Sequence, residues 1–123
     1  MDYNRRGQNV PVTSHSILGG AMGKLENEYK RGLKKRIEER FPGCIVLKND
    51  EQMLQGIPDM TILWGYCYAV LEVKRSLDAP FRPNQEYYLE KIAEQMGGIA
   101  YVICPENEEE VLSAVQHAFE IIR

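Results

Sequence analysis

Two short apolar segments joined by a Gly-Tyr dipeptide constrain the fold of this chain more than any other feature. Residues 59–64 and 68–74 contain β-branched and aromatic side chains, and the dipeptide at 65–66 is typical of a hairpin turn. Centring the turn there pairs Asp59 with Glu72, so the pattern predicts a register as well as an element. The sequence therefore predicts an antiparallel strand pair that brings two carboxylates together.

Three helices and two further strands are indicated by hydrophobic periodicity, by Pro and Gly breaks and by residues typical of helix starts. The helices are predicted over 24–41, 83–96 and 107–122, and the strands over 44–47 and 99–104. Apolar stripes are expected on the helices, including Leu25, Met96 and Ile122. Because strands and helices alternate along the chain, the sequence predicts an α/β fold, and the hairpin makes its sheet mixed.

A length of 123 residues favours a single domain, predicted over residues 24–123. Residues 1–23 are polar and Gly-rich without periodicity, which predicts an N-terminal arm that packs against something, such as a second subunit. No apolar run approaches the roughly 20 residues of a membrane span, and the N-terminus lacks the apolar stretch of a secretory signal. We therefore expect a cytoplasmic protein that makes no membrane contact.

The cysteines and histidines are too few and too scattered for a disulfide framework or a zinc site. Cys44, Cys67 and Cys104 lie in apolar surroundings and are predicted to be buried hydrophobic residues. The chain has no CxxC pair and no GxGxxG or GxxxxGK motif, which disfavours a redox or nucleotide-binding domain. No small-molecule cofactor is expected.

The net charge of −3 is unevenly distributed along the chain. Residues 1–48 contain ten Lys or Arg and five Asp or Glu, a net charge of +5, whereas residues 49–123 contain five and thirteen, a net charge of −8. A basic first third favours a local surface for a polyanion such as nucleic acid. The alternative is that the basic side chains of the first helix only solvate an exposed face.

The strand at 68–74 ends in Glu-Val-Lys, the stretch that carries most of the chemistry. Side chains alternate along a strand, so Glu72 and Lys74 share one face, about 7 Å apart at their backbones. A carboxylate and an ammonium in an apolar strand cost stability unless they are paired or used. Either they form an ion pair at a strand end, or, with Asp59 opposite Glu72, they belong to a site for Mg²⁺ or Mn²⁺.

Two helical residues are predicted to point toward the same region. Gln85 precedes Leu89 by four residues, so it lies on the buried stripe of the second helix. It either binds a phosphate, a water or the site carboxylates, or it forms hydrogen bonds at the helix end. Glu26 precedes Leu33 by seven residues and faces the core side of the first helix. It is either a further metal ligand or a first-turn acid favoured by the helix dipole.

Five residues, in this order along the chain, carry a resemblance to a known family: Glu26, Asp59, Glu72, Lys74 and Gln85. The patterns Gly-Ile-Pro-Asp and Glu-Val-Lys resemble those of the PD-(D/E)XK nuclease superfamily, and within it the VRR-NUC group of small phage and bacterial nucleases. The resemblance covers residues 24–104, roughly two-thirds of the chain. It implies a restriction-endonuclease-like αβββαβ core followed by a C-terminal helix.

The resemblance implies Mg²⁺- or Mn²⁺-dependent hydrolysis of phosphodiester bonds in DNA, in the cytoplasm of a bacterial or phage-infected cell. The implied metal ligands are Asp59, Glu72, the backbone carbonyl of Val73 and Glu26. Lys74 would orient or help to deprotonate the attacking water, and Gln85 completes the catalytic set. Contacts to DNA phosphates are expected from basic side chains: Lys30, Lys34, Lys48, Arg75 and Arg82.

Stand-alone members of this group resemble Holliday-junction resolvases and are often dimers, which implies a homodimer and a branched, junction-like substrate. Tyr87 or Tyr88 either stacks on a base or packs within the fold. Two alternatives remain open. One is a catalytically inactive nucleic-acid-binding protein on the same fold. The other is a structural phage or plasmid protein whose acidic C-terminal half recruits a partner.

Overall fold

The computed structural model describes residues 15–122, and their side chains from residue 23 onward. The helices are α1 (His15–Arg40), α2 (Gln85–Glu90), the π-helical η2 (Lys91–Gln95) and α3 (Glu108–Ile122). The strands are β1 (Ile45–Lys48), β2 (Met60–Trp64), β3 (Cys67–Val73) and β4 (Ile99–Ile103). The alternation of helices and strands confirms the predicted α/β class. Within the described part of the chain, no helix has the length and apolar character needed to cross a membrane.

The sheet has the strand order β1-β2-β3-β4, with the first two pairs antiparallel and β3-β4 parallel, so it is mixed as predicted. In the hairpin, Met60 pairs with Leu71 and Trp64 pairs with Cys67. The turn therefore falls at 65–66, where a positive φ of 62° at Gly65 suits a residue without a side chain. This is the register predicted from the sequence, and continuing it by one residue sets Asp59 opposite Glu72.

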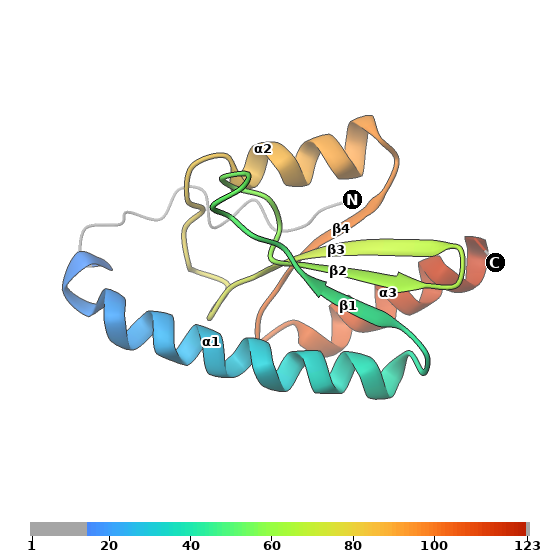
Figure 1. The fold of residues 1–123 in the computed structure, drawn as a ribbon, viewed down its shortest axis with the longest axis horizontal. Helices are drawn as coiled ribbons and strands as arrows, with labels where there is room; N and C mark the ends of the chain where they lie inside the picture. The colour runs from blue at the N-terminus through green and yellow to red at the C-terminus, as the bar shows by residue number, and fades with distance from the viewer. Residues whose placement is uncertain (1–14, 123) are drawn as a thin grey trace.

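Helices cover both faces of the sheet, with α1 and α3 on one face and α2 with η2 on the other (Figure 1). The alternation along β3 separates the two layers, because Leu71 and Val73 pack into the α1–α3 core while Val70 packs toward α2. The larger core contains these fully buried side chains: Leu33, Ile37, Phe41, Ile62, Val115 and Phe119. The sheet is thus the central layer, and β3 is its most buried strand.

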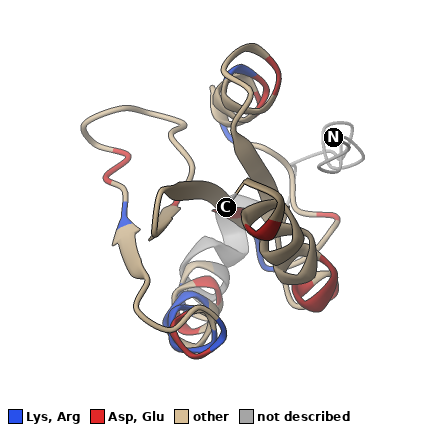
Figure 2. Cartoon of the chain, turned by 90° about the vertical axis from the view of Figure 1, so that its right-hand side faces the viewer, with Lys and Arg blue, Asp and Glu red and all other residues tan. Residues whose placement is uncertain are grey.

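Helix α1 begins at His15, well ahead of the predicted start at residue 24, so part of the predicted arm is helical. The remainder of that arm, residues 1–14, lies outside the described residues. Gly19 and Gly20 misled the prediction, because glycine weakens a helix by only about 1 kcal/mol and an established helix gains one hydrogen bond for each residue added. Figure 2 shows Lys and Arg interspersed with Asp and Glu on α1.

Three residues predicted to lie on apolar stripes are instead exposed: Leu25 at 59%, Met96 at 60% and Ile122 at 59%. Met96 turns outward because the second helix continues as a π-turn, in which the Met96 N–H donates to the carbonyl of Lys91. The wider turn breaks the 3.6-residue periodicity on which the prediction rested. Among the three free cysteines, Cys67 and Cys104 are buried as predicted, whereas Cys44 is partly exposed.

Candidate active site

Asp59 lies immediately before β2 and is held from both its backbone and its side chain. The Asn49 N–H donates to the Asp59 carbonyl (2.8 Å), and the Asn49 side-chain amide donates to the carbonyl of Pro58 (2.8 Å). The Asp59 carboxylate accepts from the Val73 N–H (2.8 Å) on one oxygen and from Lys30 Nζ (2.9 Å) on the other. The backbone bonds fix the carboxylate against β3, and its Oδ1 is paired with the Lys30 ammonium.

Glu72, Lys74 and Gln85 form a polar group in the layer between β3 and α2. Their exposed fractions are 1%, 3% and 1%. Gln85 Nε2 donates to Glu72 Oε2 (2.8 Å), and Lys74 Nζ donates to Gln85 Oε1 (2.6 Å). Lys74 Nζ lies 3.7 Å from Glu72 Oε2 and also donates to the carbonyl of Pro80 (3.1 Å). The pair is therefore fully buried and bridged by an amide, unlike an ion pair at a fraying strand end.

The residues that precede α2 pack closely against the loop that precedes Asp59. Gly56 has φ of 91°, and a Cβ built there would lie 2.5 Å from the Cβ of Asn84 and 2.8 Å from the carbonyl oxygen of Pro83. Asn84 itself has φ of 70°, a left-handed conformation that Asn tolerates better than most residues. The Arg82 N–H donates to Gln85 Oε1 (2.7 Å). Close packing at Gly56 thus sets the position of Gln85 relative to Asp59.

Burial shifts the pKa values of both Glu72 and Lys74 toward their uncharged forms. Burial, followed by the charge of Asp59, raises the pKa of Glu72 well above its usual value, while Lys74 acts in the opposite direction. Burial lowers the pKa of Lys74 although Glu72 opposes that change. Glu72 Oε1 is buried and has no hydrogen-bond partner among the described residues.

Glu26 contacts this centre chiefly through Lys30. The Lys30 ammonium lies 3.3 Å from Glu26 Oε2 and 2.9 Å from Asp59 Oδ1, so it occupies the space between the two carboxylates. Burial alone would lower the pKa of Lys30, but Asp59 and Glu26 outweigh burial and raise it, so the ammonium remains charged. Glu26 Oε2 also lies 3.5 Å from Arg82. Within the described residues, no three His, Cys, Asp or Glu side chains gather as a metal-binding group.

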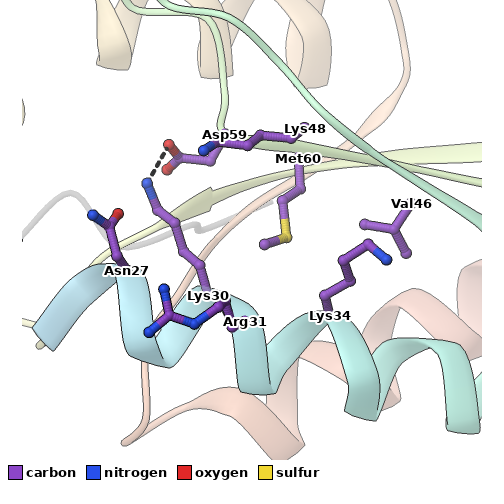
Figure 3. A pocket seen from close by; sticks show the side chains of 8 residues that line it. All are labelled: Asn27, Lys30, Arg31, Lys34, Val46, Lys48, Asp59 and Met60. Atoms are coloured by element: carbon purple, nitrogen blue, oxygen red, sulfur yellow. Dashed lines mark hydrogen bonds and ion pairs between the residues drawn. The ribbon is translucent and has the colours of Figure 1, made fainter. Parts of the chain in front are cut away.

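A pocket opens beside Asp59, between α1 and the first two strands (Figure 3), with a volume of about 300 Å³. Of the residues predicted to contact DNA, it collects Lys30, Lys34 and Lys48. Arg82 is exposed, pairs with Glu26 and Glu51 (both 3.5 Å) and does not line this pocket. The remaining predicted residues lie elsewhere: Arg75 is half-buried after β3, and Tyr87 is exposed with its ring packed edge-on against Tyr88.

Sequence reasoning missed three contributors to this centre: Asn49, Gly56 and the contact of Lys30 with Asp59. The Glu26–Lys30 pair has the i,i+4 spacing of a helical ion pair, which was visible in the sequence. Nothing in the sequence marked the Asn49 bonds or the approach of Gly56 to Asn84, because both depend on how the loop folds back. A scan against protein-family models, a search of curated proteins and a search of solved structures each returned no match.

Proposed function

We propose that this chain is a divalent-metal-dependent DNA endonuclease with a restriction-endonuclease-like core, and that Asp59, Glu72 and Lys74 form its active site. The observation that carries the proposal is the buried Glu72 carboxylate, which lies beside a second carboxylate and keeps one oxygen unpartnered among the described residues. Burying such a carboxylate lowers the stability of the fold. Groups of this kind occur mainly at functional sites, where binding or catalysis requires them.

The donor set fits a hard divalent cation such as Mg²⁺ or Mn²⁺. Asp59 and Glu72 supply carboxylate oxygens, and the Val73 carbonyl is the third ligand that the family resemblance suggests. Burial, followed by the charge of Asp59, raises the pKa of Glu72; a cation there would offset both effects and give the free oxygen of Glu72 a partner. When bound, the metal would polarise the scissile phosphate and lower the pKa of a water molecule.

The neighbouring side chains have separate tasks in this proposal. Lys74 orients the attacking water and, with its pKa lowered by burial, can accept its proton. Gln85 is a positioning residue, because its amide holds Glu72 with one end and Lys74 with the other. Glu26 can act as a further ligand only after the Lys30 ammonium has moved from between it and Asp59.

The substrate in this proposal is DNA, held by the basic pocket residues and by the basic residues at 75 and 82. A homodimer acting on branched, junction-like DNA belongs to the proposal as the family resemblance suggests it. A catalytically inactive DNA-binding protein is the second candidate, and one observation favours it. The Lys30 ammonium already neutralises Asp59 without any metal.

Cleavage of end-labelled junction, flap, duplex and single-stranded DNA, with Mg²⁺, Mn²⁺ or EDTA, separates the two candidates. We expect metal-dependent cutting by the natural chain and by Lys35→Ala, in which the substituted lysine is exposed on α1 and outside the pocket. Lys74→Ala should abolish cutting while still binding DNA. Binding without cutting of any substrate, at any metal concentration, would refute the nuclease and favour the binding protein.

A further inference from the structure

The pocket beside Asp59 has features that a charged surface alone does not require. Its floor is apolar, formed by the buried Met60 and the half-buried Val46. Its walls carry cations from two sides, Lys34 and Arg31 from α1 and Lys48 from the end of β1 (Figure 3). An apolar floor with cations at the rim suits a ligand that has one flat apolar part and one anionic part.

The charges of the pocket are available to a ligand to different degrees. Lys30 is engaged by Asp59 and Glu26, and Lys34 pairs with Glu38 at the surface (2.9 Å), where solvent screens the pair. Within the described residues, no carboxylate lies within ion-pair distance of Arg31 or Lys48. The rim therefore offers uncompensated positive charge to a phosphate.

The volume of the pocket and its place beside Asp59 limit the kinds of ligand that it can bind. A cavity of about 300 Å³ lies at the small end of ligand pockets, which matches a single nucleotide unit and excludes a duplex. Asp59 both lines the pocket and contacts the buried acid centre through the Val73 N–H. A strand whose nucleotide occupies the pocket consequently presents its next phosphate near Asp59.

We propose that the pocket between α1 and β1 binds one unpaired nucleotide of a DNA strand, with the base or sugar against Met60 and Val46 and the phosphate on Arg31, Lys34 and Lys48. The inference rests on the proposed function and specifies its substrate. The chain selects DNA with single-stranded character next to the cleaved bond. Asn27 at the rim supplies an amide that can bond to a base edge.

The test is binding in EDTA, where no cutting occurs, measured by fluorescence anisotropy with labelled oligothymidine and a labelled blunt duplex. Val46→Phe fills the pocket without changing charge, and its control Ile45→Phe alters the adjacent, exposed residue of β1, which does not line the pocket. Lys48→Glu reverses a rim charge, and its control Lys35→Glu makes the same change on α1 outside the pocket.

Both pocket variants should weaken binding of oligothymidine by roughly tenfold, and both controls by less than about threefold. Blunt-duplex binding should change little in Val46→Phe. The proposed pocket would be overturned if Val46→Phe and Ile45→Phe bound oligothymidine equally well. It would also be overturned if Val46→Phe lost as much affinity for the duplex as for the single strand. Thermal unfolding of each variant verifies its fold. Since cutting is absent from this assay, a failed pocket leaves the nuclease test with Lys74→Ala unaffected, and a failed nuclease leaves the pocket result valid.

Discussion

Two groups in this protein pair a carboxylate with a basic side chain and have opposite energetics. The buried group of Glu72, Lys74 and Gln85 lies between β3 and α2, and nearly all of its surface is removed from water. The surface group joins α1 to α3 through Arg36–Glu108 (2.6 Å) and Arg40–Glu109 (2.8 Å), in which at least one partner of each pair stays substantially exposed.

The surface group stabilises the charged form of its carboxylate, whereas the buried group does not. In the surface group, hydrogen bonds lower the pKa of Glu108 even though burial opposes them, so folding favours its charged form. In the buried group, burial and Asp59 raise the pKa of Glu72, so folding disfavours its charged form. The surface group therefore stabilises the protein modestly, whereas the buried group destabilises it unless a cation is present.

Glu72→Gln has the largest expected effect, because it keeps the shape of the side chain and removes the buried charge. We expect DNA cleavage to fall by at least about 100-fold, because the proposed metal site loses one of its carboxylate ligands. In EDTA at pH 7 we expect the variant to unfold at a higher temperature than the natural chain. The pKa of Glu72 is raised on folding, so its stability cost appears as pH rises through the ordinary value of 4.5.

The stabilisation by Glu72→Gln should therefore shrink as the pH is lowered below about 4, where both states are protonated. Scanning calorimetry of the two proteins in EDTA at several pH values measures it. A variant less stable than the natural chain at pH 7 would mean that the charged carboxylate supports the fold, and the contrast between the two groups would fail.

Gly56→Ala tests whether the buried group depends on close packing of the loop that delivers Asp59. The added Cβ would come within 2.5 Å of the Asn84 Cβ at a φ of 91°, so we expect a loss of more than about 2 kcal/mol. The matched control is Gly43→Ala, where φ is 87° but no described atom lies within 4 Å of the added Cβ.

The control should lose only the conformational penalty, about 1 kcal/mol. Urea unfolding of both variants gives the two values. Equal losses would show that the left-handed backbone alone matters and that contact with Asn84 does not.

Lys30→Met tests whether a lysine takes the place of a metal ion beside the buried group. The Lys30 ammonium lies on Asp59 Oδ1, so a divalent cation at Asp59 must displace it. We expect Lys30→Met to bind Mn²⁺ roughly tenfold more tightly in calorimetric titration, whereas Lys34→Met, one turn along and paired with exposed Glu38, should bind as the natural chain does. Weaker binding by Lys30→Met would mean that Lys30 supports the metal site instead of competing with it.

The sequence predicted the hairpin register because a two-residue turn and the period of two along a strand leave little freedom, and Asp59 and Glu72 follow from that register. It also predicted the burial of Gln85, since its helical stripe continues through the buried Leu89. It could not predict the partner of Asp59. Lys30 reaches that carboxylate because α1 packs against the sheet. The sequence alone does not distinguish Lys30 from the other lysines of α1 as the partner.

Glu108→Gln has the smallest expected effect and tests the surface group. The hydrogen bonds from Arg36 and Tyr29 lower the pKa of Glu108 against the opposing effect of burial, so its contribution is present above the ordinary value of 4.5 and is lost as pH falls through the lower folded value. At pH 7 and low salt we expect a loss of less than about 1 kcal/mol, and less again in 1 M salt, because Arg36 is half-exposed and screened. Thermal unfolding as a function of pH should bring the variant and the natural chain together below about pH 4. A difference in stability that persisted below about pH 4, or a loss of several kcal/mol at pH 7, would contradict this prediction. Solvent exposure would then not explain the contrast between the two groups.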